Sequence, residues 1–242
     1  MPKRVNTIHI IHSSDSANTN MFSFCEHFEV KVKEYRYAVN IFQNVRPANW
    51  DLLIVNLNDV SIMSDLCKAV RSVNRWSPII IVSRINDKDT IAKCLMDGAD
   101  DFVTIPYNSV ELDARVSVAL RRSDLLQPVF DKINTSKVVN SSNGLETTTI
   151  EFHPISHEVV IGGVTTSLTQ TEYQLLAYLS EKSPKYCTKH ELLENVLGYK
   201  NSNYTTSLYS HINRLRRKLD ECQLLSTRIE TTWRCGYRLV ID

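Results

Sequence analysis

The sequence predicts a doubly wound α/β domain followed by a smaller α+β domain. Through the first half of the 242 residues, short apolar runs alternate with segments of helical length, which is typical of a parallel sheet covered by helices. The second half contains three stretches of helical periodicity. It ends in two short alternating segments around a turn, which predict a β-hairpin.

The first domain contains four apolar runs that predict strands, at residues 8–11, 51–55, 78–82 and 101–105. Residues 34–50 are expected to supply another strand and a helix. Helical spacing of apolar residues predicts further helices over 63–73, 89–98 and 109–122. Beyond Arg122 the chain is polar and without periodicity. We therefore expect a first domain at 1–122, a linker at 123–147 and a second domain at 148–242.

The second domain begins with short strands, which are predicted within residues 148–168. Thr169 with Glu172, and Thr188 with Glu191, have the spacing of a helix capping box, so each pair predicts the start of a helix. A third helix is predicted over 205–219, and two strands around the turn at Gly236. Three helices followed by a hairpin is the order of a winged helix-turn-helix, which binds DNA.

The helix predicted over residues 205–219 has one apolar stripe and a polar, cationic opposite face. The stripe consists of Leu208, Ile212, Leu215 and Leu219. At about 100° per residue, the opposite side chains are those of Thr206, Ser210, Asn213, Arg214 and Arg217, with Arg216 and Lys218 at the flanks. A helix with this pattern fits the major groove of DNA. An ordinary solvated amphipathic helix would have the same pattern and is the alternative interpretation. The capped helices and the hairpin around it favour DNA binding.

Residues 148–242 resemble the DNA-binding domain of OmpR/PhoB-type response regulators. The resemblance is carried by the leading strands, the HI-RLR-KL pattern of residues 211–219 and the closing GYRL. It implies that Arg214 reaches base edges and that Asn213 and Arg216 contact the phosphate backbone. Double-stranded DNA is therefore the expected partner.

The second domain also departs from the pattern of that family. The family usually has arginine and aspartate where this chain has Thr206 and Tyr209, and its wing arginine corresponds to Trp233, with Arg234 one place later. Fewer phosphate contacts and a rearranged wing are expected. Residues 198–203 correspond to the loop through which such proteins touch RNA polymerase, which makes the polymerase a second candidate partner.

Residues 7–122 resemble a receiver domain, chiefly through the segment ADDFVTIPYNSVELDARVSVALRR at 99–122. An ordinary receiver has acidic residues after its first strand, an acceptor aspartate after the third, a hydroxyl after the fourth and a lysine after the fifth. These groups bind Mg²⁺ and carry a phosphoryl group. The aligned positions in this chain are His12, Ser13, Asn56, Ser83 and Ile105.

These replacements predict a receiver that cannot be phosphorylated. The amide of Asn56 is not a carboxylate nucleophile, and neither His12 nor Ser13 supplies the anionic oxygen that Mg²⁺ prefers. Ile105 in place of lysine avoids a buried ammonium without a partner. We interpret Asp15 as a loop or cap residue rather than a substitute ligand. No metal, cofactor or catalytic residue is therefore expected.

The receiver resemblance further implies a symmetric homodimer, formed through the fourth helix, fifth strand and fifth helix of the domain. Charged residues at or near such positions are Asp97, Asp100, Asp101, Glu111, Arg115 and Arg122. An ordinary solvated helix face is the alternative interpretation. A two-fold protein on repeated half-sites is a common way to gain DNA affinity.

Composition restricts the remaining possibilities. The net charge is +1, so DNA affinity must come from local cations such as those at 214–218. No apolar run reaches the roughly 20 residues of a membrane span, and the N-terminus does not read as a signal peptide, so a cytoplasmic protein is expected. The six cysteines are scattered without C-x-x-C spacing, which disfavours a zinc site.

The sequence thus predicts a non-enzymatic transcriptional regulator that binds DNA without receiver phosphorylation. An alternative is a regulator that is switched by a small ligand or a partner protein at the degenerate receiver pocket. A residual phosphotransfer enzyme is disfavoured because position 56 lacks a carboxylate.

Overall fold

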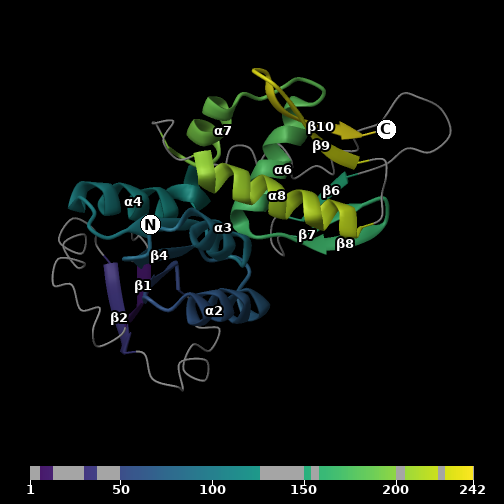
Figure 1. The fold of residues 1–242 in the computed structure, drawn as a ribbon. Helices are drawn as coiled ribbons and strands as arrows, with labels where there is room; N and C mark the ends of the chain where they lie inside the picture. The colour runs from purple at the N-terminus through teal and green to yellow at the C-terminus, as the bar shows by residue number, and fades with distance from the viewer. Residues whose placement is uncertain are drawn as a thin grey trace, which may run out of the picture. The chain divides into compact units, whose positions relative to one another are not determined.

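The computed structural model (Figure 1) describes residues 6–12, 30–36, 50–125, 150–153, 158–199, 205–222 and 227–241. The chain divides into two compact units, Met1–Arg121 and Arg122–Asp242. The division lies next to the predicted domain end at Arg122, and helix α4 (Ser109–Leu125) continues three residues past it into the predicted linker. The helix can continue because the first helix-breaking residue after it is Pro128. Residues 126–147 of the predicted linker lie outside the described ranges.

The first unit contains a five-stranded parallel sheet, which confirms the doubly wound prediction. Its strands are β1 (Asn6–His12), β2 (Val30–Arg36), β3 (Leu52–Asn56), β4 (Ile79–Ser83) and β5 (Asp101–Thr104). Their order is β2-β1-β3-β4-β5, so the sheet grows in one direction from β1 to β2 and in the other from β3 onward. Of the segment 34–50, residues 34–36 lie in β2, and 37–49, where another helix was expected, lie outside the described residues.

Apolar side chains on both faces of this sheet form two cores. Helices α2 (Val60–Val73) and α3 (Lys88–Met96) cover the face that carries Leu53 and Ile81. Helix α4 covers the other face, where Leu112 packs with Ile54 and Ile80. Neighbouring residues of a strand point to opposite faces, so a strand that is covered on both faces is apolar along its length, as β3 and β4 are up to their last residues, Asn56 and Ser83. Figure 1 shows these helices around the sheet.

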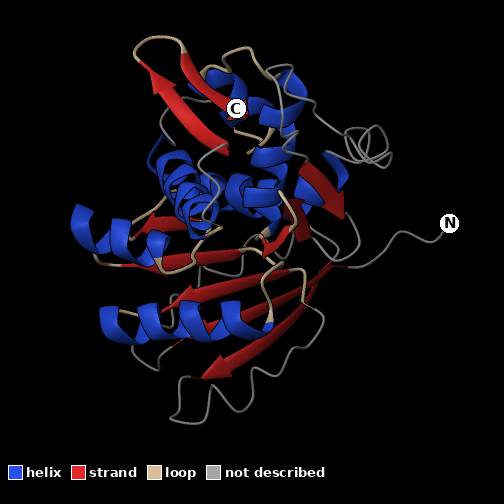
Figure 2. Cartoon of the chain, turned by 90° about the vertical axis from the view of Figure 1, so that its right-hand side faces the viewer, coloured by secondary structure: helices blue, strands red, loops and turns tan. Residues whose placement is uncertain are grey.

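The second unit begins with a three-stranded antiparallel sheet of β6 (Ile150–His153), β7 (Glu158–Ile161) and β8 (Val164–Ser167). Three helices follow, α6 (Gln170–Lys182), α7 (Lys189–Asn195) and α8 (Thr205–Glu221). The hairpin of β9 (Thr227–Thr232) and β10 (Gly236–Ile241) comes last and is the pair of long red strands joined by a tan turn in Figure 2. This order is the predicted winged helix-turn-helix.

Helix starts in this unit follow the predicted caps. The Thr169 side chain accepts from the Glu172 amide while the Glu172 carboxylate accepts from the Thr169 amide, so the first capping box is complete. At α7, Thr188 accepts from the Glu191 amide, but the Glu191 carboxylate accepts from the Tyr178 hydroxyl at 2.8 Å. The second capping box is therefore only half formed, because the Glu191 carboxylate bonds to α6 and not to the amide of the cap residue Thr188.

The apolar stripe of α8 is buried as predicted, with Leu208, Ile212, Leu215 and Leu219 at most 2% exposed. None of the helices in the described part of the chain is long and apolar enough to cross a membrane.

Candidate nucleic-acid interface and sheet-edge pocket

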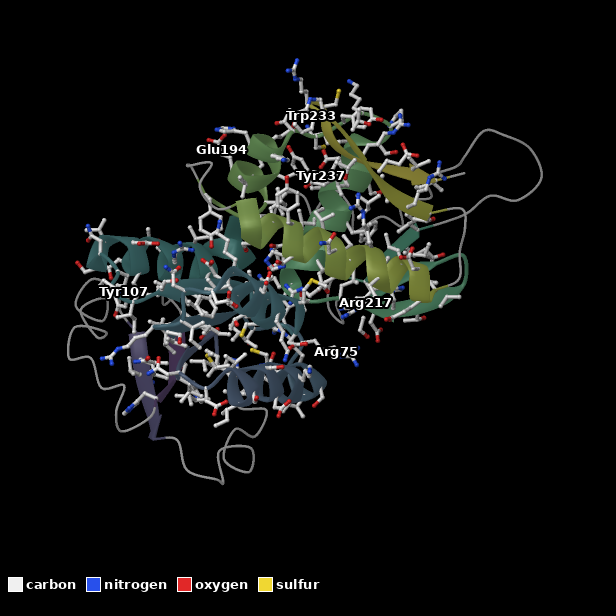
Figure 3. All side chains as sticks on the ribbon, in the orientation of Figure 1. Arg75, Tyr107, Glu194, Arg217, Trp233 and Tyr237 are labelled. Atoms are coloured by element: carbon white, nitrogen blue, oxygen red, sulfur yellow. The ribbon has the colours of Figure 1, made fainter. Side chains whose placement is uncertain are left out.

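The outer face of α8 is formed by residues one turn apart. Tyr209 is 42% exposed, and Asn213 and Arg217 follow at four-residue steps, both exposed. The Arg217 Nε lies 3.8 Å from an oxygen of Glu221, a further turn along, and the Arg217 side chain is 58% exposed (Figure 3). Residues at i, i+4 and i+8 share a helix face. A phenol, an amide and a guanidinium therefore lie in a row along the outside of the helix.

Arg214 and Ser210 do not lie on this face, so their predicted orientation was wrong. They are only 3% and 6% exposed. Arg214 Nη2 lies 2.5 Å from the Nδ1 of His211, and its Nε lies 3.4 Å from Glu172 Oε1 on α6. The prediction assumed that α8 is covered only along its apolar stripe. Helix α6 also covers a neighbouring side, and the residues on that side turn inward.

Glu172 is the centre of a buried charge cluster that joins α6 to α8. Its carboxylate lies 2.6 Å from the Lys218 ammonium and accepts from the Thr169 amide at 2.9 Å. Burial alone would raise the pKa of Glu172, but the charges of Arg214 and Lys218 and hydrogen bonds from Lys218 and Thr169 lower it to about 2. Lys218 also donates to the Ser167 carbonyl at 3.0 Å. Lys218 was predicted for DNA, but its ammonium is engaged by Glu172 and Ser167, although the side chain is 21% exposed.

Arg216 is partly exposed, and its guanidinium contacts the hairpin. Its Nε and Nη2 donate to the Ile229 carbonyl at 3.0 and 2.9 Å, and Nη2 donates to Thr231 Oγ1 at 2.6 Å. The expected free phosphate-binding side chain is therefore a tether between α8 and β9. Sequence spacing could not show this, because the hairpin follows α8 and its distance from the helix depends on the fold.

Helix α7 adds a cation that the sequence analysis missed. Lys189, the first residue of α7, contacts the Tyr209 hydroxyl through its ammonium, which lies 4.7 Å from the centre of the Tyr209 ring. A lysine immediately after the predicted cap Thr188 was the available signal. In a helix-turn-helix the first helix crosses the DNA backbone. Lys189 and Tyr209 therefore extend the exposed row of α8 onto α7.

The hairpin is fixed to the domain close to its turn, and the turn itself is exposed. Tyr237 is buried and exchanges backbone hydrogen bonds with Cys187 at 2.7 and 2.9 Å. Gly236 has φ 110°, and a Cβ there would lie 2.0 Å from the Cys187 carbonyl oxygen, so only glycine fits this close approach. Trp233 and Arg234 are exposed at the tip, as Figure 3 shows for Trp233.

Two further predicted contacts fall at the edge of the described residues. The Thr206 side chain lies outside them, although its backbone belongs to α8. The segment expected to touch RNA polymerase is described only at Gly198 and Tyr199, and residues 200–203 lie outside. Tyr199 is 5% exposed.

In the first unit, the predicted pocket residues gather where the parallel strands end. His12 on β1 is aligned with Asn56 on β3, and Asn56 with Val82 on β4, one residue before Ser83. The Ile105 amide donates to the Ser83 carbonyl at 2.7 Å, which brings the end of β5 to the same edge. His12 is 7% exposed, and Asn56 and Ser83 are fully buried. Ser13 lies outside the described residues.

The side chains at this edge supply imidazole, amide and hydroxyl groups. The Ser83 hydroxyl donates to the Asn58 side-chain oxygen at 3.2 Å, and the same oxygen accepts from the Arg84 amide at 3.2 Å. Mg²⁺ sites are usually built from carboxylates and water, so His12, Asn56 and Ser83 do not fit this ion. Among the described residues, no group of three or more His, Cys, Asp or Glu could hold a metal.

Three of the six charged residues predicted for a dimer face are buried in ion pairs within the domain. Asp100 lies 2.5 Å from Arg71, and Asp101 lies 2.6 Å from Arg115. Arg115 also reaches Glu111 at 2.7 Å, where the Glu111 side chain is 39% exposed. Asp100, Asp101 and Arg115 are at most 8% exposed, so the prediction that they project toward a partner was wrong. Their opposite charges lie close enough to pair between α2, β5 and α4.

The remaining two residues predicted for the dimer face are Asp97 and Arg122. Asp97 is the C-cap of α3, where its carboxylate accepts from Ser64 and lies 3.4 Å from the Lys68 ammonium. It is therefore also used inside the domain. The side chain of Arg122 lies outside the described residues.

Comparisons with known proteins show which proteins this chain is similar to. Residues 163–239 match the family described as "Transcriptional regulatory protein, C terminal". The chain is 28% identical to the uncharacterized transcriptional regulatory protein YclJ of Bacillus subtilis over 226 residues, which are 93% of each chain. It is 29% identical over 188 residues to the DNA-binding response regulator MtrA of Mycobacterium tuberculosis, covering 78% of this chain and 74% of MtrA.

A similar fold is found in a solved structure of a RitR mutant, with a TM-score of 0.71 and 21% identity over 98% of this chain and 100% of that one. At that identity the likeness concerns the fold alone. The family match in the second domain and the relatives show that this chain is similar to DNA-binding transcriptional regulators, which are not enzymes, and they support its resemblance to the OmpR/PhoB-type response regulators.

Proposed function

We propose that the chain binds double-stranded DNA as a transcriptional regulator whose receiver acts without phosphorylation. The observation that carries the proposal is Asn56, fully buried at the end of β3, in the place of the acceptor aspartate. An amide cannot form the acyl phosphate of a phosphorylated receiver. The relative MtrA is named a DNA-binding response regulator, which supports DNA as the partner. We also propose that the protein acts in the cytoplasm.

The DNA surface that we propose consists of the exposed row on α8, Lys189 on α7 and the hairpin tip. Arg214, Lys218 and Arg216 make contacts within the domain, so we assign groove contacts to the exposed Tyr209, Asn213 and Arg217. An amide such as that of Asn213 can pair with adenine, and the cations bind phosphates. This assignment replaces Arg214 as the base-reading residue.

A test of phosphorylation independence uses the full chain, a small phosphodonor and Mg²⁺. We expect no mass increase of one phosphoryl group in the receiver and no change in DNA affinity. Asn56→Asp should also remain unmodified, because the neighbouring His12 and Ser83 do not replace the missing metal ligands. Mass spectrometry of a well-studied phosphorylatable receiver under the same conditions is the positive control. A phosphoryl group located in the unmodified chain would contradict the proposal.

We further propose that two copies pair through the receiver and bind repeated half-sites. Helix α4 supports this, since Val110 is 69% exposed beside the partly exposed Glu111, while Arg115 anchors the same helix to Asp101. An exposed apolar side chain such as that of Val110 would be removed from water when two copies associate through this helix. Linking two DNA-binding domains raises affinity by making the second contact intramolecular.

A further inference from the structure

The tip of the hairpin carries two unfavourable features on adjacent residues. The Cys235 amide donates to the Thr232 carbonyl at 3.1 Å and closes the turn, which leaves the Trp233 side chain 84% exposed. Arg234 has φ 64°, the left-handed region, and is the only residue other than glycine with a positive φ in the described ranges. Exposing an indole and holding arginine in this conformation both cost stability. Such costs concentrate at functional sites.

The hairpin is anchored just before the tip, so the indole is held away from the domain. Arg216 donates to Ile229 and Thr231 on β9, and the Thr232 hydroxyl donates to the Tyr186 hydroxyl at 2.9 Å. These anchors come from α8 and from the segment before α7. In Figure 3, Trp233 lies at the outer end of the hairpin and Tyr237 lies further in. Trp233 is thereby presented outward on a fixed support.

The charge around the indole suits a nucleic acid. The residues of the tip, 231–235, include the exposed cation Arg234 and no acidic residue. The acidic residue nearest in sequence, Glu230, is paired with Arg228 at 3.0 Å and with Arg238 at 2.8 Å. An aromatic face beside a free-standing cation can stack on bases while the cation pairs with phosphate. The alternative partner, an apolar groove on another protein, would bury the indole of Trp233 but would offer no group to pair with the charge of Arg234.

We propose that Trp233 enters a groove of duplex DNA and wedges between two stacked base pairs, with Arg234 on the adjacent phosphate, so that binding bends the duplex. This inference rests on the proposed DNA-binding function and adds the mode of contact at the hairpin. Apolar side chains that unstack a base step commonly kink DNA, and the burial of the indole compensates for the lost stacking. The kink also brings more of the flanking DNA onto α7 and α8.

The test compares the full chain with Trp233→Ala and Trp233→Phe, using a duplex that the full chain itself selects from a random-sequence pool. Val73→Ala is the matched control, since Val73 is an apolar residue, 53% exposed, on α2 of the other domain. Three quantities are measured: the dissociation constant, the bend angle from the gel mobility of circularly permuted duplexes, and the fluorescence of 2-aminopurine placed at each step in turn.

The unmodified chain should bend the duplex and brighten 2-aminopurine at one step. Trp233→Ala should weaken binding about tenfold and lose both the bend and the brightening, while Trp233→Phe retains most of each. Val73→Ala should behave like the unmodified chain. Unchanged bending and brightening in Trp233→Ala, with or without weaker binding, would overturn the wedge. If the unmodified chain selects no duplex, the DNA-binding function is rejected and the wedge falls with it.

Discussion

Glu172 shows how one residue can determine the role of several charges. It caps α6, pairs with Lys218 at 2.6 Å and lies 3.4 Å from Arg214, with its own side chain 1% exposed. The local capping pattern of Glu172 was readable from the sequence. Its partners were not, because they lie on a helix more than forty positions later. Asp101 and Arg115 in the receiver illustrate the same point, since an apparent surface charge pattern is an internal ion pair.

Glu172→Gln should destabilise the second domain by about 3 kcal/mol at neutral pH, because it leaves two cations without their buried partner. The folded-state pKa of Glu172, about 2, lies below the ordinary 4.5, so its contribution is full above pH 4.5 and is lost as the pH falls toward 2. The deficit of the variant should therefore shrink over that range. Hydrogen exchange of α6 and α8 at several pH values measures this.

Glu221→Gln is the matched control for that experiment, since Glu221 is 68% exposed and lies 3.8 Å from Arg217. Its effect should stay below about 0.5 kcal/mol. A loss in the control as large as that in Glu172→Gln, or a deficit that is constant with pH, would show that the buried carboxylate does not hold the cluster together.

At the scale of elements, α8 and the β9–β10 hairpin act as one unit. The apolar stripe of α8 was predictable from periodicity, and the turn of the hairpin was predictable from Gly236. The structure confirms both. The tether made by Arg216 was not predictable, because arginine at that position looks like any exposed cation until the hairpin is placed beside it. The wing therefore depends on α8 for its position, and the two elements share the DNA surface that we propose.

Arg216→Ala should release the hairpin without removing a phosphate contact. We expect faster hydrogen exchange in β9 and β10 and weaker DNA binding, with an unchanged slope of log affinity against log salt concentration. Arg217→Ala supplies the contrast, because its side chain is 58% exposed. It should leave hairpin exchange unchanged and make the salt slope shallower by about one unit. A shallower slope for Arg216→Ala would restore its assignment as a phosphate contact.

At the scale of the whole molecule, the protein combines a receiver fold, for which we propose that acceptor chemistry is lost, and a winged helix-turn-helix fold. The receiver sheet has an apolar core on each face, so an amide at Asn56 and an apolar side chain at Ile105 are compatible with this architecture. A domain preserved in this way can still serve as an association surface. Pairing would then be constitutive, since no phosphoryl group is needed to create it.

The full chain should therefore sediment as a dimer at micromolar concentration without any phosphodonor. Val110→Glu should shift it toward monomer and weaken binding to paired half-sites more than to a single half-site, because it places a charge on the exposed apolar part of α4. Val73→Glu, an equivalent change on α2, is the control. A chain that sediments as a monomer throughout, or an equal response of both variants, would count against a receiver interface on α4.

The sequence by itself determined the order of elements, the helix caps at Thr169 and Thr188 and the presence of an amide, Asn56, directly after the strand predicted at 51–55. These depend on local periodicity, on short-range hydrogen bonds and on the chemistry of single side chains. Only the tertiary structure decided which charges face outward. Arg214 and Lys218 turn toward Glu172, while Arg217 remains exposed. Burial and pairing depend on neighbours that are distant in the chain, and no pattern within one helix contains them.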